Sequence, residues 1–123
     1  MTAKKKPVAR EQRSRAALPA DIQDAFRHAA ERRECKLKTV QREAVEAFLR
    51  QRSTLLIGGA SPTYLAASRT HRPLQVILPA ALTREATKAA MQDGVPLSTL
   101  LHTALTAHHE TVLRLAAVEG GKG

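Results

Sequence analysis

The chain has 123 residues, of which 43% are hydrophobic and only 2% aromatic, with no tryptophan. This length suits one small domain, and a core of alanine, leucine and valine favours close-packed helices over a β-sandwich or barrel. The net charge of +9 lies mainly in residues 1–60, which carry 14 Lys/Arg against 7 Asp/Glu. An uneven basic charge favours a polyanion partner, nucleic acid before an acidic membrane, over a basic protein without such a partner.

The sequence lacks signals for export, membrane insertion and disulfide formation. No apolar run approaches the ~18 residues that span a bilayer. The basic start MTAKKKPVAREQR has no apolar segment of the kind found in secretory signals. The single cysteine, Cys35, excludes an internal disulfide and a multi-cysteine zinc site. We therefore expect a cytoplasmic protein with no membrane partner.

The first half of the chain contains a basic arm, two helices and a linker. Residues 1–12 are rich in Lys and Arg and lack periodic apolar residues, which predicts a disordered arm. Apolar residues at helical spacing predict helices over 19–33, beginning at Pro19, and over 37–52. Residues 53–72 include two adjacent glycines and a Ser-Pro pair, which predict a linker.

The second half begins with a strand and continues with two helices. Apolar residues alternate over residues 73–78, which is the pattern of a short strand. Helical spacing predicts a helix over 80–93, ended by Gly94 as a left-handed cap, and another over 97–116. Residues 117–123 are glycine-rich and are expected to be a frayed tail.

The two halves coincide when the chain is shifted by 60 residues. Leu18-Pro19-Ala20 falls on Leu78-Pro79-Ala80, and Ala29-Ala30 falls on Ala89-Ala90. Apolar positions of the later helices also coincide, so we infer an internal duplication. A single strand needs a partner for its backbone hydrogen bonds. The duplication predicts that residues 13–18 are that partner.

The order strand, proline, helix, glycine turn, helix over residues 73–105 resembles the ribbon-helix-helix DNA-binding family of the Arc, MetJ and CopG type. With the duplication, the resemblance covers nearly all of residues 13–109. It implies a mainly α fold with a two-stranded antiparallel β-ribbon, built from repeats over 13–52 and 73–116. Because one chain carries both repeats, the protein would be a tandem pseudo-dimer. This arrangement is similar to that of virulence-C accessory proteins, which assist T-DNA processing on plasmids.

The resemblance implies that the outer face of the ribbon reads bases in the major groove of DNA. Strand alternation directs four candidate base-reading side chains outward: Arg13, Arg15, Gln75 and Ile77. Arginine can pair with guanine, glutamine with adenine, and isoleucine can contact the thymine methyl group. If the first strand belongs instead to the disordered arm, its arginines contact only phosphate.

The first predicted strand departs from the family pattern. It would bury Ser14, Ala16 and Leu18, a set with low strand propensity. We therefore expect it to order only against the second strand or on DNA. The outward residues of the two strands also differ, which predicts an asymmetric DNA site.

Family members also hold phosphates at the start of the second helix of each repeat, where backbone N–H groups and the helix dipole favour an anion. The matching positions, together with nearby lysines and the basic arm, form the candidate phosphate-binding set: Lys36, Lys38, Thr39, Leu97, Ser98, Thr99, Lys4, Lys5, Lys6 and Arg10. Ser98 is also an ordinary residue for a helix start. The arm should add salt-sensitive affinity without sequence preference.

Other kinds of site receive less support. A possible metal cluster consists of His102, His108, His109 and Glu110. Adjacent histidines point about 100° apart on a helix, so we expect solvated histidines, no metal and no cofactor. The stretch GGASPT lacks the Gly-Lys-Ser/Thr ending of a phosphate loop, and a lone turn cysteine such as Cys35 is usually inert. No nucleophile, base and orienting group come together, so we expect no enzyme.

The sequence thus predicts sequence-specific binding of double-stranded DNA. The role would be an accessory factor in plasmid or T-DNA processing or conjugal transfer, or a transcriptional repressor. Two alternatives are a protein-interaction module, such as an antitoxin or relaxosome adaptor, and a protein that coats nucleic acid nonspecifically. Family antitoxins use a long tail after the second helix, and little chain follows residue 116. Other DNA-processing proteins are further candidate partners, and assembly beyond the monomeric pseudo-dimer is left open.

Overall fold

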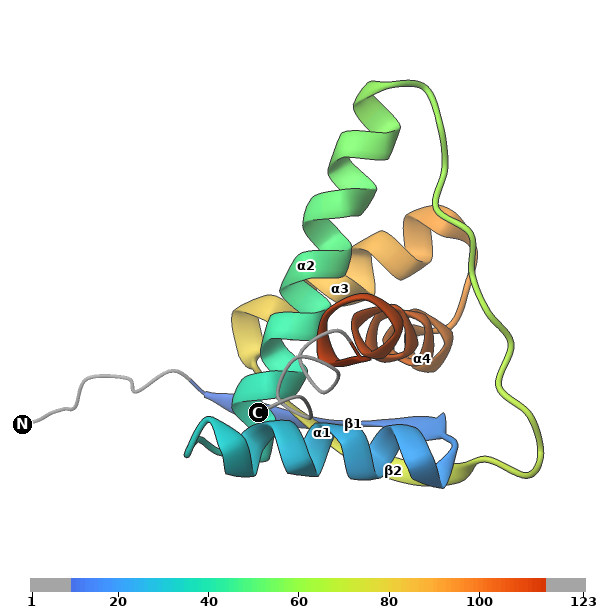
Figure 1. Ribbon diagram of the computed structural model, residues 1–123. Coiled ribbons are helices and arrows are strands. Elements are labelled where there is room, and N and C mark those ends of the chain that lie inside the picture. Colours follow the sequence, from blue (N-terminus) through green and yellow to red (C-terminus); the bar gives the residue numbers. More distant parts are fainter. Residues whose placement is uncertain (1–9, 115–123) are drawn as a thin grey trace, which may run out of the picture.

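The computed structural model describes residues 10–114. The elements follow the chain in this order: β1 (Glu11–Leu18), α1 (Ala20–Arg32), α2 (Leu37–Ile57), β2 (Arg72–Pro79), α3 (Ala80–Asp93), α4 (Leu97–His108) and a short π-helical segment η1 (His109–Leu113). The fold is mainly helical with a two-stranded antiparallel sheet, which confirms the predicted fold class at this level (Figure 1). Within this part of the chain, no helix is both long and apolar enough to cross a membrane.

The two strands pair along their whole length. Glu11 lies opposite Pro79 at one end of the sheet, and Leu18 lies opposite Arg72 at the other. The prediction that the segment before the first Leu-Pro is the partner of the second strand is therefore confirmed. Near the middle of the sheet Arg15 lies opposite Gln75. The 60-residue shift also superimposes these two residues. The pairing of the strands is therefore centred on equivalent positions of the two halves.

One face of the sheet is covered by helices. Helix α2 packs on β2, and α4 packs on β1 and against α2. The residues that the strands bury on this face are Ala16, Leu18, Val76 and Leu78. Buried apolar positions also recur 60 residues apart through the helices: Ile22 with Leu82, Ala29 with Ala89, Val40 with Leu100, and Ala44 with Ala104. The repeated sequence pattern thus corresponds to a repeated burial pattern.

The first helix of each half begins at the same residue type and ends with the same turn geometry. Pro19 and Pro79 are the N-cap residues of α1 and α3, where the fixed φ and missing N–H of proline are tolerated. Gly94 ends α3 with φ of 73°, which confirms the predicted left-handed cap. The position 60 residues earlier, Glu34, also has a positive φ, of 52°, although it is not a glycine. The turn geometry is therefore repeated even where the residue is not.

Helix α2 is longer than the sequence predicted. We placed its end at residue 52, but it continues to Ile57, so the linker begins at Gly58. The reason is that nothing between residues 53 and 57 opposes a helix, since this segment contains neither glycine nor proline. The last turns rise beyond the other helices (Figure 1). Ile57 is 89% exposed, so this part of the helix does not pack back on the core.

The chain termini also differ from the predicted boundaries. Strand β1 begins at Glu11, so the last residues of the predicted arm belong to the sheet. Residues 1–9 of the arm, with Lys4, Lys5 and Lys6, and the tail after residue 114 lie outside the described residues. The predicted helix over 97–116 changes from α to π geometry at His109.

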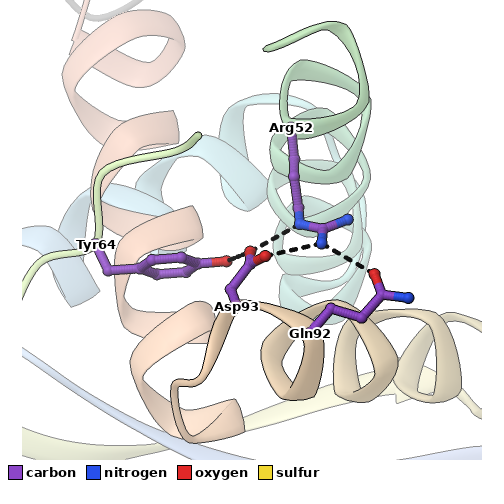
Figure 2. Close-up of polar contacts among 4 residues, drawn as sticks. All are labelled: Arg52, Tyr64, Gln92 and Asp93. Atoms are coloured by element: carbon purple, nitrogen blue, oxygen red, sulfur yellow. Dashed lines mark hydrogen bonds and ion pairs between the residues drawn. The ribbon is translucent and has the colours of Figure 1, made fainter. Parts of the chain in front are cut away.

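The linker is fastened to the helices by a polar cluster (Figure 2). The guanidinium of Arg52 donates two hydrogen bonds to the Asp93 carboxylate, at 2.8 and 2.9 Å, and one to Gln92 Oε1 at 3.1 Å. The hydroxyl of Tyr64, from the linker, donates to the same carboxylate. Farther along the linker, Leu65 N donates to the Thr103 hydroxyl at 2.9 Å. The linker therefore follows a defined path from α2 to β2.

The histidines near the C-terminal end are buried, which corrects the prediction that they are solvated. His102 is 4% exposed and His108 is 8% exposed, while His109 is half-buried. Histidines on a helix of a small protein are usually exposed to solvent, but α4 is enclosed by β1, α2 and α3. The described residues contain no cluster of three or more metal-ligating side chains.

His108 should make the stability of the fold depend on pH. No group in the described part of the chain hydrogen-bonds either of its ring nitrogens. Burial lowers the pKa of His108. The Glu43 carboxylate raises this pKa, and the Arg33 guanidinium lowers it further. Since the unfolded state then binds more protons, stability falls as pH drops below about 6.5, by at most about 1.4 kcal/mol per pH unit until the lowered pKa is reached.

We expect His108→Phe, which copies Phe48 of the first half, to remove this pH dependence and to stabilise the fold. Urea unfolding at pH 5.5 and 7.5 measures both effects. His28→Phe, at an exposed position of α1, is the control and should leave the dependence unchanged. An unaltered pH dependence in the His108 variant would contradict the prediction.

Candidate nucleic-acid interface

The four predicted base-reading residues lie on one face of the sheet. The register places Arg13 opposite Ile77 and Arg15 opposite Gln75. Arg13, Arg15 and Gln75 are exposed and Ile77 is half-buried, whereas their neighbours Val76 and Leu78 are fully buried. The predicted orientation of the strands is therefore correct, and the four side chains form two adjacent cross-strand pairs. We call this surface the outer face of the ribbon.

The two arginines of the outer face are available for a ligand. In the described structure no carboxylate forms an ion pair with Arg13 or Arg15. The nearest acidic strand residue, Glu11, is bound instead by the ammonium group of Lys38 from α2. Uncompensated guanidinium groups on an open surface can form bidentate hydrogen bonds with guanine O6 and N7.

Both outer edges of the ribbon are fixed by buried side chains from the helices. On the β2 edge, the side-chain amide of Gln41 donates to Gln75 O at 3.1 Å and accepts from Ile77 N at 3.3 Å. On the β1 edge, His102 Nδ1 lies 2.6 Å from Ala17 O and donates to it, since a carbonyl oxygen can only accept. These contacts prevent rotation of the strands, so they determine which side chains face outward.

A third buried side chain closes one end of the ribbon. The amide of Gln23, on α1, donates to Leu18 O and to Arg72 O, each at 3.1 Å. These carbonyls belong to the last residue of β1 and the first residue of β2. One glutamine thus joins both strands where they leave the sheet.

The positions predicted to bind phosphate lie at the starts of α2 and α4. Their N-cap residues, Lys36 and Pro96, make no side-chain capping hydrogen bond. The amide N–H groups of Thr39 and Thr99 donate to Lys36 O and Pro96 O, so they are occupied within the first helical turn. The free N-terminal ends of these helices attract an anion through the preceding N–H groups and the helix dipole.

The remaining candidates for phosphate contact differ in their surroundings. Lys36 and Ser98 are exposed, and Leu97 is half-buried. Lys38 is committed to Glu11, and its side chain is 33% exposed. Arg10 is exposed just before β1, and its carbonyl accepts a hydrogen bond from Ala80 N.

Several residues that shape this interface were missed from sequence. Gln23, Gln41 and His102 are polar residues within the apolar stripes of their helices. A polar residue within such a stripe indicates a buried hydrogen-bonding partner, and that signal was present. The partners of these side chains could not be named from the sequence, because a local sequence does not indicate which backbone carbonyls of a distant strand will lie nearby.

Comparison of the chain with family models, with curated proteins and with solved structures finds no match.

Proposed function

We propose that the chain is a sequence-specific double-stranded DNA-binding protein that inserts its β1–β2 ribbon into the major groove. The observation that carries this proposal is the outer face, where two uncompensated arginines and a glutamine stand exposed over a ribbon fixed at both edges. A two-stranded ribbon fits the major groove, and these side-chain types can pair with guanine and adenine. The chain acts by binding and carries no catalytic group in this proposal.

The two halves of the chain act in this proposal as a single-chain ribbon-helix-helix pseudo-dimer. The coincidence of the sheet register with the 60-residue shift supports this, because a pseudo-dimer would have its two-fold axis between Arg15 and Gln75, which lie opposite each other. The repeated burial pattern supports it independently. The unlike residues at paired positions favour an asymmetric DNA site. The role would be an accessory factor in plasmid or T-DNA processing, or a repressor, since both need only site recognition.

Selection of bound duplexes from a random DNA pool at ~0.15 M salt tests the proposal, because nonspecific binding is weak there. We expect enrichment of one asymmetric motif. A palindromic motif would overturn the pseudo-dimer, because two identical strands would then form the ribbon. Absence of enrichment would overturn specific recognition.

Arg15→Ala and Gln75→Ala should each relax the choice of base at one position near the centre of the site. The expected loss of discrimination is about 1–3 kcal/mol at that base pair, with other positions unchanged. Competition binding with duplexes that vary one base pair at a time measures it. Arg50→Ala, which removes an exposed charge from α2, is the control. An equal loss of affinity for all duplexes would mean that the ribbon does not read bases.

A protein-interaction module is the second candidate function. It is favoured by apolar side chains left exposed at the end of α2 and in the linker, namely Leu56, Ile57 and Leu65. A relaxosome adaptor would use such a surface. A protein partner retained at high salt would support this function, because contacts with DNA phosphates weaken under that condition.

A further inference from the structure

Cations lie at both ends of the ribbon, but they come from different parts of the chain. At the end where Glu11 meets Pro79, they are Arg10 and the lysines that begin α2. At the other end, where Leu18 meets Arg72, the outer face carries only Ala17 and Pro73. Helix α4, whose His102 contacts Ala17 O near this end, has no basic residue in its first turn. Its symmetry-related helix has Lys38 there.

The end of the linker and the first residue of β2 supply the missing charge at this second end. It descends to the ribbon at the right-hand end in Figure 1 and enters β2 through a turn over residues 68–72, which we call the linker turn. Arg69 and Arg72 of this turn are exposed. No acidic residue within the described structure forms an ion pair with either of them. Two free guanidinium groups therefore lie at this end of the ribbon.

The linker turn has a defined shape. Ser68 N donates to His71 Nδ1 at 3.1 Å, and His71 N donates back to Ser68 O at 3.1 Å. The His71 ring stacks on His102, with ring centroids 5.5 Å apart, and His102 in turn holds Ala17 O. The turn, the first turns of α4 and the end of β1 are therefore joined. Arg69 and Arg72 belong to the turn that these contacts hold in place.

We propose that the linker turn binds the DNA backbone, with Arg69 and Arg72 contacting phosphates at the end of the ribbon opposite to Arg10 and Lys36. This inference rests on the proposed function. The eight residue pairs of the ribbon span about 26 Å, whereas the major groove is about 12 Å wide. A ribbon of this length lies along the groove, so its two ends meet the DNA backbone at opposite ends of the contact. The linker turn is then part of the binding surface as well as a connection between the two halves.

The double variant Arg69→Ala/Arg72→Ala tests this assignment. Each phosphate contact contributes about 0.9 to the slope of log affinity against log salt concentration. The variant should lose about 1.8 of that slope. Its affinity should equal that of the wild type near 1 M salt and be about 60-fold lower at 0.1 M. The loss should be the same for a duplex selected by the wild type and for an unrelated duplex.

Two further variants of the full chain serve as controls. Arg50→Ala/Arg114→Ala removes the same amount of charge from helix positions away from the ribbon and should keep the slope. Arg69→Lys/Arg72→Lys keeps the charge and should restore most of the slope. Unfolding in urea shows whether all variants fold alike.

The outcomes separate this inference from the proposed function. A salt slope of the alanine variant equal to that of the Arg50/Arg114 control would overturn the linker-turn assignment while leaving the proposed function intact. Weaker binding of the selected duplex alone would also overturn it, because it would mean that the arginines read bases. Failure of the wild type to select any duplex would overturn the proposed function and, with it, this inference.

Discussion

Leu78→Ala should destabilise the protein by about 2–5 kcal/mol, whereas Ile77→Ala should cost less than about 1 kcal/mol. The two residues are neighbours in β2 but face opposite sides. Leu78 is 0% exposed and belongs to the core beneath the helices that pack on β2, so its truncation leaves a cavity. Ile77 lies on the outer face, where few core contacts are lost.

Urea unfolding of the two variants measures this difference, and DNA binding separates their effects further. Leu78→Ala should weaken binding to all duplexes, because it lowers the population of folded protein. Ile77→Ala should change the choice of base at one position and leave stability nearly unaltered. Equal destabilisation by both substitutions would mean that the strand does not present one face to solvent.

Asp93→Ala should destabilise the protein by about 3 kcal/mol. The side chains of Arg52 and Asp93 are only 10% and 15% exposed, so the substitution leaves a nearly buried guanidinium without its carboxylate. It also removes the acceptor of the Tyr64 hydroxyl, which frees the linker from α3 (Figure 2). The control is Asp24→Ala, in an exposed ion pair with Arg27, which should have little effect.

The contribution of Asp93 should also vanish in acid. The hydrogen bonds from Arg52 lower the pKa of Asp93, burial opposes this, and the Tyr64 hydroxyl adds to the lowering. A carboxylate with a lowered pKa stabilises the folded state fully above its unfolded pKa, near 3.9. That stability is lost as the pH falls through the folded-state pKa. In urea unfolding between pH 2 and 6, the free energy of unfolding should therefore fall more steeply with decreasing pH in the wild type than in Asp93→Ala. Equal slopes of this free energy against pH would contradict this account.

The pairing of the strands could be predicted because it follows from local signals that repeat. Alternation over residues 73–78 defined one strand and its buried face, and the repeated Leu-Pro-Ala located the other. The left-handed cap at Gly94 was predicted because few other residues tolerate that backbone conformation. The outward placement of Arg15 and Gln75 followed from the period of two residues along a strand.

Features that depend on distant contacts could not be predicted in this way. The sequence between residues 53 and 57 is compatible with helix or linker, and the α-helix that forms there projects beyond the core. Arg52 and Asp93 lie 41 residues apart and meet only in the folded chain. His108 occupies a position held by Phe48 in the other half, so its burial was implied by the duplication. Its polar side chain suggested solvent instead, and that interpretation was wrong.

Since both strands of the ribbon belong to one polypeptide, the ribbon forms by an intramolecular step. A ribbon shared between two identical chains couples folding to association and is lost on dilution, whereas a linker keeps the effective concentration of the second strand constant. The covalent connection also has a consequence for evolution. In a symmetric dimer a single codon change alters both strands, but here a change at Arg15 leaves Gln75 untouched. Under the proposed function, each half of the DNA site can therefore diverge independently of the other.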